Sequence, residues 1–132
     1  MVIKGIRTEK KEMNIKIVNI ADKLKLIQEH WKPRIAGELN DSYVKLVRLK
    51  GEFIWHHHES EDELFWVVKG KLRMQLRDQE LIVGEGEFII IPRGVEHRPL
   101  ADEEVHVILV EPKTTVNTGT ERSERTAEAE WI

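Results

Sequence analysis

Hydrophobic and polar residues divide this chain into regions of different periodicity. Residues 1–12 are polar, mixed in charge and without a repeating pattern, which predicts a flexible N-terminal extension. The next region has apolar residues at spacings of four, three and four, as on one face of a helix: Ile20, Leu24, Ile27 and Trp31. Pro33 ends this pattern. We therefore expect one helix over about residues 20–31, packed as a lid or a subunit contact.

Short apolar runs dominate the middle of the chain. They are rich in Val, Ile, Leu and aromatic residues and are broken by glycine and polar pairs at intervals of about eight to twelve residues, which predicts an all-β sandwich or barrel. The expected strands are Tyr43–Leu49, Glu52–His58, Leu64–Lys69, Lys71–Arg77, Glu80–Val83, Glu87–Ile91 and Val105–Glu111. Tight turns are expected at Asp78–Gln79 and Gly84–Gly86. The helix and these strands predict one barrel domain over residues 13–112.

One predicted strand is apolar on both faces. If Glu63 and Phe65 point into the barrel, then Leu64, Trp66 and Val68 point outward and are still hydrophobic. A sheet with two apolar faces needs its outer face covered. We therefore expect a homodimer packed through this face, or the N-terminal helix folded over it.

The last region, residues 113–132, is polar until Trp131 and Ile132. Such a segment is compatible with a strand-swapped arm, a short helix or a disordered tail. The sequence leaves these alternatives open.

Composition narrows the class of protein. A chain of 132 residues is long enough for one domain, and without cysteine it has neither disulfides nor thiolate-bound zinc. A net charge of −3, with 34% charged residues of both signs, lacks the basic excess of a nucleic-acid-binding surface. No run of about 18 apolar residues predicts a membrane span, and the N-terminus lacks the apolar run of a signal peptide. We expect a cytoplasmic protein with no nucleic-acid or membrane partner.

Three histidines and a carboxylate form the candidate site. Side chains of an extended segment alternate between faces, so His56 and His58 project to one side and His57 to the other. Glu63, at the start of the next strand, and His97, on a third segment, would join them on one ion. Neutral imidazole and ionised carboxylate favour one borderline divalent metal (iron, manganese, nickel, zinc or cobalt) over calcium or magnesium. The sequence therefore predicts a divalent-metal site.

The spacing of these residues resembles the two signature motifs of the cupin superfamily. In this chain the motifs are Gly51-x4-His56-x-His58-x4-Glu63-x6-Gly70 and Gly86-x5-Pro92-x-Gly94-x2-His97. The leading glycine lies one residue closer than in the usual pattern, and Ala101 stands where the second motif ends in asparagine. With the flanking strands, the resemblance covers residues 40–112.

The resemblance implies a double-stranded β-helix, the jelly-roll or RmlC-like cupin barrel, with an ion inside its mouth. It also implies that His56, His58, Glu63 and His97 are the metal ligands. Four protein ligands on an ion that accepts roughly six leave open positions for water or substrate. Isomerases of the mannose-6-phosphate-isomerase-like type and oxygenases are among the relatives that the resemblance implies.

Other residues are candidates for further roles. Glu63 is a candidate general base if it stays unligated, and Glu61 is the alternative carboxylate ligand if the strand register slips. Arg98 or Arg93 could hold an anionic substrate group, the alternative being a surface salt bridge. Candidates for the apolar lining of a substrate cavity, or for plain core, are Met74, Phe65, Phe88 and Ile90.

Together these patterns predict a metal-dependent enzyme that acts on a small polar molecule such as a sugar, a sugar phosphate or a keto acid, by isomerase- or oxygenase-type chemistry. The alternative is a non-catalytic small-molecule binding or sensing module stabilised by its metal. A barrel with a purely structural ion is a third interpretation, which predicts a filled coordination shell.

Overall fold

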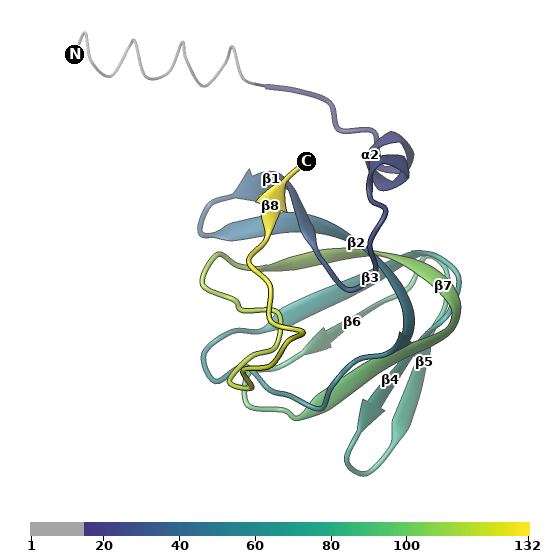
Figure 1. Ribbon diagram of the computed structural model, residues 1–132, viewed down its shortest axis with the longest axis vertical. Coiled ribbons are helices and arrows are strands. Elements are labelled where there is room, and N and C mark those ends of the chain that lie inside the picture. The colour runs from purple at the N-terminus through teal and green to yellow at the C-terminus, as the bar shows by residue number, and fades with distance from the viewer. Residues whose placement is uncertain (1–14) are drawn as a thin grey trace, which may run out of the picture.

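A computed structural model describes residues 15–132 and shows one sheet that curls into a barrel (Figure 1). Its helix and strands are α2 (Ile20–Leu26), β1 (Arg34–Leu39), β2 (Ser42–Glu52), β3 (Glu63–Lys69), β4 (Leu72–Leu76), β5 (Glu80–Val83), β6 (Phe88–Ile91), β7 (His97–Pro112) and β8 (Glu130–Trp131). The strand order is β5-β4-β7-β2-β1-β8, and β3 pairs with both β6 and β7. The predicted all-β jelly-roll class with one N-terminal helix is confirmed. The expectation for residues 1–12 lies outside the described residues.

Strand β7 organises the barrel because it pairs with three other strands. Its first residues lie against β4, its later residues lie against β3, and β2 runs antiparallel to it along most of its length. Its side chains alternate between faces, so Val105, Val107 and Leu109 are buried inside the barrel. There they join an apolar cluster with inward residues of β2 and β4, such as Val47 and Met74. This core holds the strands that carry the candidate site.

Helix α2 packs on the outer face of β2 and β7. Leu24 and Ile27 are buried against Leu46 and Ile108. The side chain of Asn19 accepts a hydrogen bond from a backbone N–H of the first turn at 2.9 Å, which begins the helix. Within the described residues, no helix has the length and apolar character that crossing a membrane requires.

The helix is shorter than the predicted range of residues 20–31. It stops where Ile27 becomes extended, with φ −86° and ψ 120°, and the Ile27 carbonyl accepts a hydrogen bond from Arg48 at 2.5 Å. Trp31, which continued the helical spacing in the sequence, has φ 66°, and its ring stacks on Phe53 with 4.9 Å between centroids. The apolar spacing continues past the helix because Trp31 packs on the barrel from the irregular segment between α2 and β1.

The segment between β2 and β3 is not the strand expected over Glu52–His58. Strand β2 ends at Glu52, and the residues that follow leave the sheet. They return to it where His56 forms an isolated antiparallel bridge to His97. The alternation of side chains is kept at this bridge, since His56 and His58 are buried and the neighbour between them is partly exposed.

Two strands depart from expectation in their extent. Strand β7 begins at His97 rather than Val105, because the acidic residues 102–104 form an irregularity in the pairing with β2 instead of a break. Strand β1 was not predicted, since its run is short and its register against β2 shifts at Gly37. Both differences come from bulges, which interrupt the apolar alternation without ending a strand.

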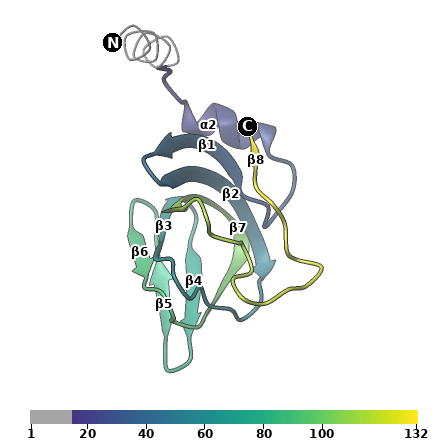
Figure 2. The same ribbon diagram turned by 90° about the vertical axis from the view of Figure 1, so that its left-hand side faces the viewer.

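The C-terminal arm (residues 113–132) folds back onto its own barrel (Figure 2). Its last residues form β8, which lies parallel to β1, and the Ile132 N–H donates to the Ile35 carbonyl at 3.0 Å. Earlier in the arm, the Thr120 N–H donates to the His57 carbonyl at 3.2 Å. The structure therefore shows an arm paired within its own chain, rather than a helix or a disordered tail.

An apolar face on β3 and β6 stays exposed in the single chain. Trp66 and Phe88 lie opposite each other and are 45% and 57% exposed, and Val68 and Ile90 share this face. The prediction that Phe88 and Ile90 line a cavity is wrong, because β6 turns the alternate residue Ile91 inward instead. Helix α2 covers β2 and β7 rather than this face, so the homodimer stays a prediction.

Charge placed on the exposed apolar face tests the dimer. We expect the wild-type chain to sediment as a dimer and the double variant Trp66→Lys with Phe88→Lys to sediment as a monomer, because buried lysines without partners oppose association. Analytical ultracentrifugation measures the mass. Ile82→Lys, at an exposed apolar residue of β5, is the matched control and should keep the dimer. A monomeric wild-type chain would contradict the prediction.

Candidate metal centre

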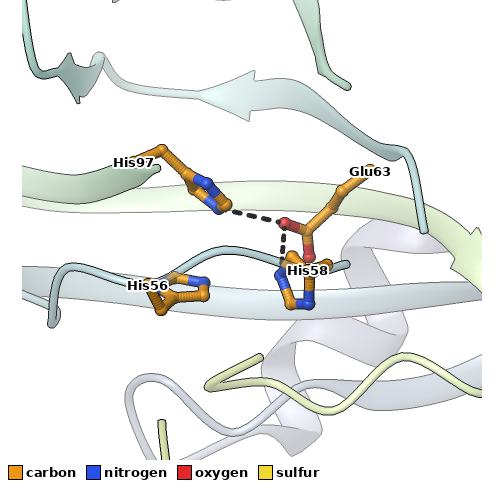
Figure 3. A group of neighbouring side chains, drawn as sticks. All are labelled: His56, His58, Glu63 and His97. Atoms are coloured by element: carbon orange, nitrogen blue, oxygen red, sulfur yellow. Dashed lines mark ion pairs between the residues drawn. The ribbon is translucent and has the colours of Figure 1, made fainter. Parts of the chain in front are cut away.

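Three segments of the barrel supply the four candidate ligands (Figure 3). Glu63 opens β3, His97 opens β7, and His56 and His58 come from the loop between β2 and β3. The His56 N–H donates to the His97 carbonyl at 3.1 Å, and the His97 N–H donates back to the His56 carbonyl at 2.9 Å. The Gly94 N–H donates to the His58 carbonyl at 2.7 Å. Backbone pairing thus holds the ligand loop against the start of β7.

The four side chains converge in the barrel interior. Their ligand atoms all lie within 4.8 Å of one another. Oε1 of Glu63 is 3.3 Å from Nε2 of His58 and 3.4 Å from Nε2 of His97. Each of the four residues is at most 4% exposed. The structure therefore brings together the residues singled out in the sequence and places them away from bulk water.

Several polar atoms of this group make no hydrogen bond within the described part of the chain. They are Nδ1 and Nε2 of His58, Nε2 of His97 and Oε1 of Glu63, all buried. Buried polar atoms without partners destabilise a fold, so native structures provide partners for nearly all of them. A borderline divalent cation accepts imidazole nitrogen and carboxylate oxygen together. The residues present therefore fit a metal ion of this class.

Backbone carbonyls set the tautomer of two rings. Nδ1 of His56 lies 2.9 Å from the Ile54 carbonyl, and Nδ1 of His97 lies 2.9 Å from the Val95 carbonyl. A carbonyl can only accept, so each Nδ1 carries the proton and each Nε2 keeps a free lone pair. Metal-binding histidines are commonly oriented by such a hydrogen bond. Both rings are therefore prepared to bind an ion through Nε2.

The charge states of the group also suit a cation. Burial, followed by repulsion from His97, lowers the pKa of His56 to about 4. Burial acts to raise the pKa of Glu63, but the close approach of Glu111, His58 and His97 to its carboxylate outweighs burial and holds this pKa well below its usual range. At neutral pH His56 is therefore a neutral imidazole and Glu63 an anion, which are the forms that bind metal.

A buried ion pair behind the site was not predicted from the sequence. Nζ of Lys45 lies 2.9 Å from Oε1 of Glu111, and both side chains are almost fully buried. Burial and the nearby Glu63 carboxylate raise the pKa of Glu111 well above its usual value. Strand parity was the available signal, because Lys45 shares the inward face of β2 with Val47, and Glu111 shares that of β7 with Leu109.

A small cavity adjoins the candidate ligands. Its volume is about 40 Å³, compared with roughly 30 Å³ for one molecule of liquid water. His56, Glu63 and Glu111 form polar parts of its wall, and Phe65 forms part of its apolar wall. The space beside the ligands therefore holds about one small group.

Three other residues singled out in the sequence lie away from this cavity. Met74 is fully buried in the apolar core. The guanidinium of Arg98 donates to Gln75 at 2.9 Å and to Glu52 at 3.3 Å, on the opposite face of β7 from the ligands. Glu61, the alternative ligand, accepts a hydrogen bond from the C-terminal arm at 2.8 Å. These contacts agree with the salt-bridge alternative for Arg98.

Comparison with known proteins identifies similar sequences and structures. The family model described as "Cupin domain" matches residues 45–111. A cupin-2 domain containing protein from Shewanella frigidimarina is 45% identical in its crystal structure, with a TM-score of 0.72, covering 73% of this chain and 94% of that one. Protein NMB1881 from Neisseria meningitidis is 28% identical, with a TM-score of 0.68, covering 74% of this chain and 99% of that one.

A similar curated protein is YdbB of Bacillus subtilis (strain 168), described as uncharacterized. It is 40% identical to this chain over 63 residues. The match covers 47% of this chain and 56% of YdbB, so the chain spans about half the length of this relative.

The lowered pKa of His56 predicts a pH dependence of folding. Because this pKa falls from 6.5 to about 4 on folding, the unfolded chain takes up the proton first as the pH drops. The stability due to neutral His56 is complete above pH 6.5 and is lost between pH 6.5 and about 4. The loss is on the order of 3 kcal/mol.

Urea unfolding of metal-free protein at a series of pH values measures this loss. We expect it to be smaller in His56→Gln, because glutamine does not titrate. If the free energy of unfolding fell equally with pH in wild type and His56→Gln, the prediction would be contradicted. The loss due to Glu63 is separate, since its lowered pKa places that loss below its ordinary value of 4.5.

Because Lys45 and Glu111 form a buried ion pair, we expect their mutations to have non-additive effects on the free energy of unfolding. Lys45→Met should lower the free energy of unfolding by on the order of 3 kcal/mol, because it leaves the Glu111 carboxyl buried without its cation. Lys45→Met combined with Glu111→Leu should recover most of that loss, since both polar groups are then gone. Chemical denaturation measures all the values. A double variant as unstable as the sum of both single variants would refute the coupling.

Proposed function

This chain belongs to the cupin domain family, and from that premise we propose that it is a divalent-metal protein that acts on a small polar molecule. One observation carries the proposal: a buried group of three histidines and a glutamate whose ligand atoms lie within 4.8 Å of one another. Iron, manganese, nickel, zinc and cobalt are the ions that such ligands favour. A single ion of this kind is the proposed cofactor.

In this proposal His56, His58, Glu63 and His97 hold the ion. A divalent ion bound there would supply a Lewis acid for a substrate carbonyl or hydroxyl group. His56 keeps its proton on Nδ1 through the hydrogen bond to Ile54 and stays neutral at pH 7. Glu63 stays ionised, which is the form required of a ligand and also of the general base considered from the sequence.

The finer parts of the proposal rest on the motif resemblance. They are isomerase chemistry of the mannose-6-phosphate-isomerase-like type or oxygenase chemistry, a homodimer and a cytoplasmic location. The exposed apolar face that contains Trp66 and Phe88 supports the homodimer, because a second copy would bury it. The ligand group suits either reaction class, so a direct assay has to decide between them.

A non-catalytic binding or sensing module is the second candidate function. The observation that favours it is the small space beside the ligands, about 40 Å³, which leaves little room for a substrate at the ion. Pockets that enclose a whole small molecule span roughly 300–1,000 Å³, so a ligand of this protein would bind outside that cavity and away from the ion. Saturable binding of a small molecule without turnover would favour this alternative.

A pair of neighbouring histidines tests the metal proposal. His58→Ala should lose stoichiometric metal, because it removes one of the buried ligands, whereas His57→Ala should keep it, because His57 points away from the group. Protein purified without a His tag is stripped, reloaded with iron or manganese and measured by elemental analysis. Stoichiometric metal in His58→Ala would refute the ligand assignment.

The same two variants separate an enzyme from a sensor. Oxygen uptake and sugar isomerisation are followed in wild-type protein loaded with iron or manganese. We expect turnover in wild type and His57→Ala and its loss in His58→Ala, because only His58→Ala removes a candidate ligand of the ion that would supply the Lewis acid. Wild-type protein that is fully loaded with metal but shows no turnover in either assay would favour the binding or sensing module over the enzyme.

A further inference from the structure

We propose that part of the C-terminal arm, residues 114–127, is a gate that closes the cavity beside the candidate ligands and moves aside to let a molecule larger than water reach them. The gate does not depend on a bound ion. Only its role in admitting a substrate rests on the proposed function.

The closed arrangement leaves the ligands almost out of reach. The cavity beside them has about 40 Å³, which is close to the space of one water molecule, and each ligand is at most 4% exposed. Pockets that enclose small organic molecules span roughly 300–1,000 Å³. Part of the cavity wall therefore has to move before such a molecule can place a group at the ligands.

Besides the ligand loop, two segments outside the sheet form the wall of this cavity. One precedes β1 and contributes Trp31, and the other is the gate, which contributes Asn117. The backbone N–H of Trp31 donates to the Arg48 carbonyl at 3.0 Å, its indole N–H donates to the Lys50 carbonyl at 2.8 Å, and its ring stacks on Phe53. The segment that carries Trp31 is therefore a fixed part of the wall.

The gate has few contacts that resist its movement. Of residues 113–132, only Thr115 and Thr118 are buried, so no large apolar side chain anchors this segment in the core. Its backbone contact with the ligand loop is a hydrogen bond from the Thr120 N–H to the His57 carbonyl at 3.2 Å. Segments with little buried apolar surface open at a low cost in free energy while the rest of the fold stays intact. The gate is therefore the movable part of the wall.

Contacts inside the gate hold it together as one unit. The side chain of Asn117 donates to the Arg125 carbonyl at 2.8 Å and accepts from the Ala127 N–H at 2.9 Å. The hydroxyls of Thr118 and Thr126 lie 2.7 Å apart. These contacts join the two ends of the gate to each other rather than to the barrel, so the gate can move outward without breaking them. Its flanks stay attached, because the chain continues from β7 on one side and β8 pairs with β1 on the other.

Movement of the gate would join the cavity to a larger space. Asn117 and Pro33 line both the cavity and a space of about 440 Å³ between the arm and strands β1 and β2 (Figure 1). Pro33 belongs to the fixed segment that carries Trp31, so Asn117 is the residue of this partition that leaves with the gate. The joined space lies in the size range of pockets for small organic molecules.

Arg125 and Gly119 fasten the closed gate. The guanidinium of Arg125 donates to the Glu52 carbonyl at 3.1 Å and lies over the ring of Phe53, 5.5 Å from its centroid. Gly119 has φ +60°, and a Cβ placed there would overlap the His57 carbonyl oxygen, so this close approach requires glycine. The closed position therefore depends on one exposed side chain and on one residue without a side chain.

Diethyl pyrocarbonate, which acylates neutral imidazole and is too large for the closed cavity, tests the gate in metal-free protein. Peptide mass spectrometry follows the rate at each histidine. We expect slow reaction of His56 and His58 in wild type. The rate should be roughly fivefold higher in Arg125→Gln and at least roughly tenfold higher in Gly119→Ala, because each variant removes a contact of the closed gate. Arg122→Gln is the matched control and should react like wild type, since Arg122 is an exposed gate residue with no hydrogen bond to the ligand loop in the described part of the chain.

Two further measurements separate opening of the gate from unfolding of the barrel. His30 and His106 lie outside the gate and should react at the same rate in all four proteins. Amide hydrogen exchange should become faster at Thr120 in the two gate variants, because its N–H is bonded to the ligand loop only when the gate is closed. It should stay unchanged at Val107 in the barrel core.

Two results would overturn the gate. One is an equal reaction rate of His56 in wild type and in both gate variants, and the other is faster reaction in both variants accompanied by faster exchange at Val107. Metal content is measured separately on the same proteins after reloading, which distinguishes the two proposals. Gate-dependent reaction in a protein that takes up no metal would sustain the gate and reject the proposed function, whereas metal uptake with equal reaction rates would do the reverse.

Discussion

The backbone pairing of His56 with His97 is the constraint on which the candidate metal centre depends. Two hydrogen bonds, at 3.1 and 2.9 Å, fasten the irregular loop after β2 to the first residue of β7. Strand β7 in turn pairs with β3, whose first residue is Glu63. The loop needs no regular strand geometry of its own, because its hydrogen bonds to β7 fix its position. The ligands are therefore close together only when β2, β3 and β7 are assembled.

The interior of the barrel combines two environments that oppose each other energetically. One part is an apolar cluster that includes Val47, Val107 and Leu109, and its burial favours folding. The other part contains the metal ligands and the pair between Lys45 and Glu111, whose burial removes charged groups from water. The polar part lies on the same inward faces of β2 and β7 as the apolar part. The alternation of side chains along each strand thus determines which residues point into the barrel. Whether these residues are apolar or polar then determines which part of the interior they form.

Much of the fold and the ligand set could be predicted from local patterns. Short alternating runs identified most of the strands, and the spacing of His56, His58, Glu63 and His97 identified residues that the structure brings together. What could not be predicted depends on partners distant in the sequence. Trp31 matched a helical spacing but stacks on Phe53, and the two residues of the buried ion pair are 66 positions apart.

The other differences between the predicted and the observed structure also come from contacts between residues distant in the sequence. Strand β6 is four residues long, so its inward parity depends on its register with β3 rather than on its own pattern, and Phe88 was therefore assigned to the wrong face. The C-terminal arm is polar and has little periodicity, and its position follows from pairing with β1 at the other end of the chain. Neither the inward face of β6 nor the position of the arm can be predicted from a short stretch of sequence.

The tautomer-setting contact of His56 has a consequence for the thermodynamics of ion uptake. Its proton resides on Nδ1 against the Ile54 carbonyl, its Nε2 is free near neutral pH, and Glu63 has already given up its proton. These two groups release nothing to the buffer when a cation arrives. At these positions the heat measured on loading would reflect coordination and dehydration, largely independent of which buffer is chosen.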